Sequence, residues 1–180
     1  MKIFVMIAAI CIASLNSNAQ TYITKNGKIT FFSKTSMENI DATNNQVVSV
    51  FTKTGSLQFS VLISAFQFKK ALMQEHFNES YMESDKFPKS TFKGTITDIS
   101  KVDFTKDGNY AVSVSGDLTI HGVTKKVTVP GTINIAAGKV NAVATFNVLL
   151  ADYNVKVESS VMGNIAKSIE IKVDCNYLSK

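Results

Sequence analysis

The sequence of 180 residues contains no Trp, no Arg and only two Pro. All 19 basic residues are Lys, against 14 acidic residues, and this mild excess is spread along the chain. Arg carries the planar fork that reads guanine and clamps phosphate, and nucleic-acid binders usually gather their basic residues in one patch. We therefore expect no nucleic-acid partner. The scarcity of Pro, with only nine Gly, also excludes collagen-like and Pro-rich chains.

Cysteine is scarce as well, with Cys11 and Cys175 the two examples. Cys11 lies in an N-terminal apolar run that we expect to be removed, which leaves Cys175 without a partner for an internal disulfide. Cys175 lies in the alternating apolar register of a strand, so a buried, inert thiol is expected. Hydrophobic residues make up 45% and charged residues 18%, which is typical of one globular domain with a genuine core.

The first nineteen residues have the layout of a cleavable secretory signal. Lys2 supplies a positive charge, residues 3–15 are apolar, and Ser17-Asn18-Ala19 places small residues at the −3 and −1 positions. The apolar run is shorter than the roughly 20 residues of a transmembrane helix. Ile10 before Cys11 argues against a lipid anchor, which needs a small residue there. We predict a signal peptide over residues 1–19, a mature domain over residues 20–180, and a location in the periplasm or outside the cell.

Alternation of apolar and polar residues recurs along the chain and predicts about eight strands. They are expected at residues 29–34, 47–52, 57–63, 92–99, 110–120, 123–135, 140–150 and 169–177. Turn signals lie at Asn26-Gly27, Thr54-Gly55, Asp107-Gly108-Asn109, His121-Gly122 and Gly138. Short strands joined by tight turns predict an all-β protein, either an antiparallel barrel or a sandwich.

One segment, Ser64 to Met82, has a helical pattern instead. Its apolar residues recur at three-to-four spacing, Ser64 is placed to cap it, and Pro88 ends any helical tendency. These apolar residues are Phe66, Met73, Phe77 and Tyr81. A helix inserted between strands must cover something apolar, which in a barrel is the open mouth or a groove beside it.

The sequence contains few groups that do chemistry. It has no Gly-rich phosphate loop, no nucleophile elbow and no pair of His at metal-binding spacing. His76 and His121 stand far apart in the sequence, without a Cys or carboxylate cluster around either. We therefore predict no enzymatic activity, no cofactor and no metal. The glutamates that recur every four residues, Glu75, Glu79 and Glu83, are interpreted as a solvated face. The doublets Lys69-Lys70 and Lys125-Lys126 are also interpreted as solvated surface, although they could meet a negative head group.

Two stretches resemble the YceI-like family of periplasmic polyisoprenoid-binding proteins. Residues 73–92, MQEHFNESYMESDKFPKSTF, are similar to that family's helix and the aromatic-acidic loop after it. Residues 114–127, VSGDLTIHGVTKKV, are similar to its Gly-x-Leu-Thr-Ile-x-Gly-Val-Thr-Lys-x-Val hairpin. The resemblance implies a lipocalin-like, extended antiparallel barrel whose lumen takes a long isoprenoid chain. Leu149 and Leu150 depart from the family's polar residues, and Tyr81-Met82 replaces two Phe, which can alter what fills the lumen.

A lipid-binding lumen needs apolar side chains that face one interior. The runs Leu57/Phe59/Val61/Ile63, Tyr110/Val112/Val114 and Val140/Ala142/Ala144/Phe146 should do so, because alternate residues of a strand share a face. His76 and Lys86 flank the expected helix and could meet a polar head group. The candidate ligand-binding residues are Phe59, Phe66, Met73, His76, Phe77, Tyr81, Lys86, Phe92, Val112, Val114 and Phe146.

Three functions compete at this stage. The first is the binding, carriage or sequestration of an isoprenoid or other long apolar lipid. The second is a non-catalytic interaction or stress-response module, with the barrel interior filled by side chains. An enzyme is the third, and it lacks any nucleophile–base or metal constellation. The residues alone leave open whether the lumen is hollow, and they leave open the oligomeric state, a homodimer included.

The signal prediction is tested by the intact mass of the exported protein. Cleavage after Ala19 should give a mass that matches residues 20–180. A mature species that retains residues 1–19, or one that carries an acyl group on Cys11, would contradict it.

Overall fold

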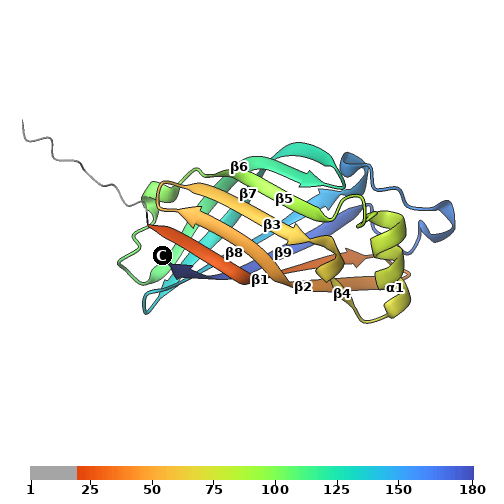
Figure 1. Ribbon diagram of the computed structural model, residues 1–180, viewed down its shortest axis with the longest axis horizontal. Helices are drawn as coiled ribbons and strands as arrows, with labels where there is room; N and C mark the ends of the chain where they lie inside the picture. Colours follow the sequence, from red (N-terminus) through yellow and green to blue (C-terminus); the bar gives the residue numbers. More distant parts are fainter. Residues whose placement is uncertain (1–19) are drawn as a thin grey trace, which may run out of the picture.

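The structure is a computed structural model and describes residues 20–180, so the predicted signal peptide lies outside the described residues. Nine strands and several short helical segments follow one another along the chain (Figure 1). The strands are β1 (Thr21–Lys34), β2 (Asn39–Thr52), β3 (Ser56–Leu62), β4 (Gln67–Phe68), β5 (Lys89–Ile96), β6 (Gly108–Ile120), β7 (Val123–Ala136), β8 (Lys139–Leu149) and β9 (Ser168–Ser179). The helical segments are η1 (Ile63–Ala65), α1 (Ala71–His76), η2 (Phe77–Tyr81), η3 (Ile99–Lys101), η4 (Leu150–Tyr153) and η5 (Ser159–Val161).

Eight of these strands form a closed antiparallel barrel. The hydrogen-bonded order is β1-β9-β8-β7-β6-β5-β3-β2, and β1 also pairs with β2, which closes the sheet on itself. The two-residue strand β4 is added beside β2, where Ala42 pairs with Phe68. Closure leaves the eight long strands without a free edge and gives each of them one inner and one outer face. The predicted all-β, eight-stranded barrel is confirmed.

The alternation that predicts the strands also decides which side chains face inward. The three apolar runs expected to share one interior do so: their members are buried or partly buried, and all except Ala144, which lines a cavity of the same interior, belong to connected apolar clusters. The strands begin earlier than predicted, however. β1 starts at Thr21 and β2 at Asn39, so Asn26-Gly27 lies inside a strand and is not a turn.

Gly27 is needed because another chain segment passes close to it. The pairing of β1 with β2 shifts register on both sides of Gly27, which makes this part of β1 irregular. A Cβ atom built on Gly27 would lie 2.5 Å from Sγ of Cys175 and 3.2 Å from the carbonyl oxygen of Val47. A bulged strand can thus continue where a Gly next to Asn is otherwise typical of a turn.

The predicted helix from Ser64 to Met82 is the largest error. Ser64 lies in the 3-10 turn η1 and caps no α-helix. Phe66 follows η1, Phe68 lies in the short strand β4, and the α-helix begins only at Ala71. The helix then continues as the π-helical turn η2, in which the amide N–H of Met82 donates to the carbonyl oxygen of Phe77 at 2.9 Å. Pairing of β4 with β2 competes with helix formation over residues 64–70 and explains the difference.

The inserted segment lies at one end of the barrel (Figure 1). Because the strands alternate in direction, the β1–β2 and β6–β7 hairpins and the β8–β9 connection reach that same end. The β6–β7 hairpin turns at His121 and Gly122, both with positive φ, as the sequence predicts. The C-terminus lies at the opposite end. We call the end with α1 the mouth and the other the far end.

Aromatic side chains fill the far end. Tyr22 stacks on Phe51 and on Phe104, with ring centroids 4.7 and 5.0 Å apart. Tyr177 packs edge-on against Phe51 and donates its hydroxyl to Oγ of Ser49 at 2.7 Å, since the Ser49 hydroxyl itself donates to the carbonyl oxygen of Gln58. Phe51, Tyr22 and Tyr177 are all at most 5% exposed, so this half of the barrel is solid core.

Cys175 is a free thiol within residues 20–180 and is completely buried, in agreement with the sequence. Burial raises the pKa of the thiol to about 12 from an ordinary value of 9.0, and the neighbouring charge of Asp174 adds to the effect. Below pH 9 the thiol is neutral in both the folded and the unfolded chain, so its ionisation does not affect stability there. Its ionisation in the unfolded chain therefore lowers the stability of the fold as pH rises from 9 toward 12.

We expect folded residues 20–180 at pH 8 to be inert toward a thiol-specific reagent, and the same residues when denatured to react at Cys175 alone. The free energy of unfolding of the native sequence should fall relative to that of Cys175→Ala as pH rises above 9, and the difference should be constant below it. Rapid labelling of the folded protein would show that Cys175 is accessible. A difference in the free energy of unfolding that does not change with pH would show that burial does not raise the pKa of the thiol.

Candidate ligand-binding site

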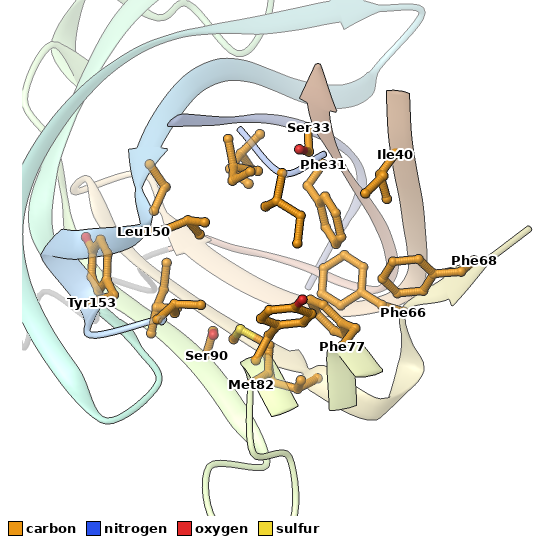
Figure 2. A pocket seen from close by; sticks show the side chains of 18 of the residues that line it. Phe31, Ser33, Ile40, Phe66, Phe68, Phe77, Met82, Ser90, Leu150 and Tyr153 are labelled. Carbon is orange, nitrogen blue, oxygen red and sulfur yellow. The ribbon is translucent and has the colours of Figure 1, made fainter. Parts of the chain in front are cut away.

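The mouth half of the barrel is hollow. A cavity of about 300 Å³, the outer cavity, is enclosed by the barrel wall, by α1 and η2, and by the β8–β9 connection (Figure 2). Its lining is almost entirely apolar, and Phe31, Phe77 and Met82 face Leu150 and Tyr153 across it in Figure 2. A concave apolar site with few polar groups is the usual form of a small-molecule site.

Four phenylalanines form one wall of the outer cavity. Phe77 lies 5.0 to 5.6 Å, measured between ring centroids, from Phe31, Phe66 and Phe68 (Figure 2). These rings come from β1, the turn after η1, β4 and η2, so the cluster fastens the inserted segment to the barrel wall. Aromatic pairs at such distances contribute about 0.5–1.5 kcal/mol each beyond their burial. The helix is therefore held by apolar contacts that can rearrange more readily than a strand ladder.

A second space, the inner cavity, lies deeper in the barrel and has a volume of about 130 Å³. Phe59 and Phe92 lie on one side of it, and the small residues Gly131, Ala142 and Ala144 on the opposite strands β7 and β8 leave the room. The two cavities share five lining residues, which form a common wall: Ile29, Val61, Ser90, Leu118 and Phe146. The lumen thus consists of two apolar compartments in series.

Polar groups in the outer cavity are few, and within residues 20–180 its only ionisable polar groups other than Tyr hydroxyls are Glu38 and His76. Glu38, in the β1–β2 hairpin, accepts hydrogen bonds from Nζ of Lys70 at 3.2 Å and from Nδ2 of Asn164 at 3.1 Å. These two bonds lower the pKa of the Glu38 carboxyl, the bond from Asn164 most, so it is ionised near neutral pH. The exposed His76 also reaches the lining, from the end of α1.

A histidine holds three segments of the mouth together. Nε2 of His121 lies 2.7 Å from Oε2 of Glu83, in the loop after η2, and Nδ1 lies 3.3 Å from the carbonyl oxygen of Tyr153 in η4. The imidazole packs edge-on against Phe87, and its side chain is only 11% exposed. The carbonyl oxygen of Tyr153 and the carboxylate of Glu83 can only accept hydrogen bonds. When both ring nitrogens of His121 carry a proton, the ring therefore donates to both partners.

The contact with His121 favours the ionised form of the Glu83 side chain. The hydrogen bond from His121 is the main cause that lowers the pKa of Glu83, and the charge of Lys86 adds to it. The contact is therefore present above the ordinary pKa of 4.5 and is lost as pH falls through the lower value in the folded protein.

The structure brings ten of the eleven predicted residues to the two cavities. Six of them line the outer cavity, namely Phe66, Met73, His76, Phe77, Tyr81 and Phe146. The inner cavity is lined by Phe59, Phe92, Val112 and Val114, and also by Phe146.

Lys86 is the exception, because it lies outside both cavities. Glu83, three residues before it, has a positive φ of 44°. Lys86 then forms an ion pair with Glu83 at 3.7 Å and lies over the ring of Phe87. The other lysines singled out by the sequence are also paired at the surface: Lys69 with Asp41, Lys70 with Glu38, Lys125 with Asp152 and Lys126 with Asp117.

Sequence reasoning missed several residues of the site. Phe31 and Phe68 belong to the aromatic wall, but Phe31 stands beside Phe32 in the sequence and Phe68 lies in the segment read as helix. The pair His121–Glu83 joins residues 38 positions apart and has no local signal. Tyr153, Val155 and Ile165 come from the β8–β9 connection, which has no regular periodicity.

Over residues 20–180, no helix is long and apolar enough to cross a membrane. In the same range, no group of three or more His, Cys, Asp and Glu side chains is arranged to hold a metal ion.

Replacing Glu83 with Gln should loosen the segment that covers the mouth. The neutral amide side chain is a weaker hydrogen-bond acceptor for His121 than the carboxylate, so the backbone amide protons of residues 77–87 should lose protection from hydrogen exchange severalfold. Glu79→Gln, at an exposed position of η2, is the matched control and should leave protection unchanged. Equal protection in Glu83→Gln and the native sequence would show that the contact does not hold the segment.

Comparison with known proteins supports the same architecture. The family model described as YceI-like domain matches residues 15–177. A polyisoprenoid-binding domain from Saccharophagus degradans, implicated in plant cell wall breakdown, superposes with a TM-score of 0.78 at 11% identity, over 90% of this chain and 99% of that one. Burkholderia cenocepacia BcnA gives 0.71 at 17% identity, over 84% and 96% of the two chains.

A more distant structural match is the YceI protein of Campylobacter jejuni. It superposes with a TM-score of 0.56 at 15% identity, over 75% of this chain and 80% of that one. A search among curated proteins finds no significant match. At such identities the solved structures establish the fold alone, whereas the family model spans nearly the whole described chain. The protein belongs to the YceI-like family.

Proposed function

We propose that this protein binds an isoprenoid or another long apolar lipid in the barrel lumen and carries or sequesters it outside the cytoplasm. The observation that carries the proposal is the pair of apolar cavities in series, which open behind α1 and η2 and end at the aromatic core. Burial of apolar surface contributes about 25 cal/mol per Å², so a chain of many carbons binds tightly without any catalytic group.

The family adds to this proposal. The Saccharophagus degradans domain is described as polyisoprenoid-binding, and we extend that ligand class to this chain because the lumen here is apolar along both cavities. The alternative of a non-catalytic interaction or stress-response module requires a barrel filled by side chains. That condition fits the far end, where the aromatic core is solid, but not the mouth half.

The proposed location is the periplasm or the extracellular space, on the basis of the signal-like residues 1–19. A protein in that compartment meets membrane lipids at the cell envelope and needs no cofactor to hold one. We propose a role without enzymatic activity, with the lipid as the principal partner and no nucleic acid. Whether two copies form a homodimer is decided by measuring the mass in solution.

The proposed entrance lies at α1 and η2. Met73, Phe77 and Tyr81 of these elements line the outer cavity, whereas Leu72 on the same helix is 61% exposed and lies outside the lining. An apolar chain that enters here breaks no hydrogen bonds of the eight barrel strands, because α1 and η2 are held by ring contacts of Phe77 and by the bond between Glu83 and His121. His76 and Glu38 at the rim would then face the polar head of the ligand.

Extraction of the purified protein into organic solvent, followed by mass spectrometry, tests the function. The native sequence should release about one lipid per chain. Phe77→Asp places a charge inside the apolar lining and should abolish lipid co-purification, with a β-type far-ultraviolet circular dichroism spectrum retained.

Leu72→Asp introduces the same charge on the outward side of the helix and should keep the lipid. Absence of lipid from the native protein would remove the support for the function. Unchanged lipid in a folded Phe77→Asp variant would place the entrance elsewhere.

A further inference from the structure

The depth of the lumen is limited by the way the barrel is packed. The inner cavity ends at Phe51, Ile133 and Tyr177, which are at most 5% exposed and belong to the continuous core of the far end. Beyond Phe51, Tyr22 and Phe104 stack on one another and leave no passage. A chain that enters at the mouth therefore meets a closed floor inside the barrel.

The two volumes set the length of chain that fits above this floor. A dry apolar cavity of about 150 Å³ holds one benzene, so the outer cavity of about 300 Å³ takes about two six-carbon groups. On the same scale the inner cavity of about 130 Å³ takes about one. One chain running through both cavities contains about 15 to 20 carbons, or three to four isoprene units.

The direction of the chain follows from where the polar groups lie. Glu38, His76 and Asn164 border the outer cavity at its rim, and the inner cavity is lined by apolar side chains apart from Ser90, Thr91 and Thr132. The tail must then occupy the inner cavity and the head the rim. To pass between the compartments, the tail has to displace the side chains of their common wall, Val61, Leu118 and Phe146 among them.

Small residues on β7 and β8 decide how much room the tail finds. Gly131 pairs with Ala144, and a Cβ atom on Gly131 would lie 3.7 Å from Val112 and 3.8 Å from the Cβ of Ala144. Both positions thus face the inner cavity, opposite Phe59 and Phe92. Larger side chains at these positions would fill the inner cavity from the wall.

We propose that the inner cavity measures the tail of the ligand, so that affinity for apolar chains stops rising at about 15 to 20 carbons, and that Ala144 is a specificity-determining residue. The inference rests on the proposed lipid-binding function. A limit on chain length, set by Ala144, goes beyond lipid binding as such.

The test uses residues 20–180 and a series of all-trans prenyl alcohols with 10, 15, 20 and 45 carbons. Each alcohol displaces the fluorescent probe 1-anilinonaphthalene-8-sulfonate from the protein. Affinity should rise up to the alcohols of 15 and 20 carbons and should then level off, because the remaining units of the 45-carbon alcohol stay in water in both the free and the bound state. Hexadecanol should follow the same limit if the shared feature is an apolar chain, whether linear or branched.

Ala144→Phe adds a benzene-sized group to the inner cavity. It should weaken binding of the 20-carbon alcohol by about tenfold or more and leave the 10-carbon alcohol unchanged. Thr145→Phe is the matched control, because Thr145 is exposed on the outer face of the same strand. Ala144→Leu replaces Ala144→Phe if the larger side chain prevents folding, as judged by circular dichroism.

The outcomes separate this inference from the proposed function. Binding of the 45-carbon alcohol about tenfold or more tighter than that of the 20-carbon alcohol, or an equal effect of Ala144→Phe on short and long chains, would overturn the length limit and leave lipid binding intact. Failure of every alcohol to displace the probe would overturn both.

Discussion

The structure depends on the pairing of β1 with β9 on one side and with β2 on the other, because this closes the sheet. Once eight strands form a ring, every second residue must face a common interior, and an interior of that size is just filled by side chains or holds one ligand. The residues on the inner faces decide between these outcomes. Large rings at the far end fill it, whereas Gly131, Ala142 and Ala144 leave space farther along the barrel.

The mouth is built from connections of different kinds. The β1–β2 and β6–β7 hairpins are tight, but the β3–β5 and β8–β9 connections are long and carry most of the apolar side chains that enclose the outer cavity. Two kinds of contact secure this cover. Phenylalanine rings attach the helix side to the wall, and the hydrogen-bonded His121 joins Glu83 to the backbone of Tyr153. The rings hold without fixed geometry, whereas the hydrogen bonds are directional and depend on charge.

The strands and their inner faces are predictable from the sequence because period-two alternation reports the two faces directly, whereas the choice of a barrel over a sandwich came from the resemblance to the YceI-like family. Leu57/Phe59/Val61 and Val140/Ala142/Ala144 needed no long-range information. The prediction failed where tertiary contacts override a local signal. Asn26-Gly27 resembles a turn but lies in β1 because Cys175 passes against Gly27, and residues 64–70 have helical spacing but pair with β2 through β4. The partnership of His121 with Glu83 arises only once the hairpin and the loop meet at the mouth.

A hollow lumen that holds one apolar chain is the central claim, and electron density tests it most directly. In a crystal structure of the protein purified with its natural ligand, continuous density should run from the rim near His76, past Phe146, to the floor at Phe51. This density should fit a single apolar chain that stops at the floor. Cavities closed by rotated side chains, or filled only by ordered water, would contradict it.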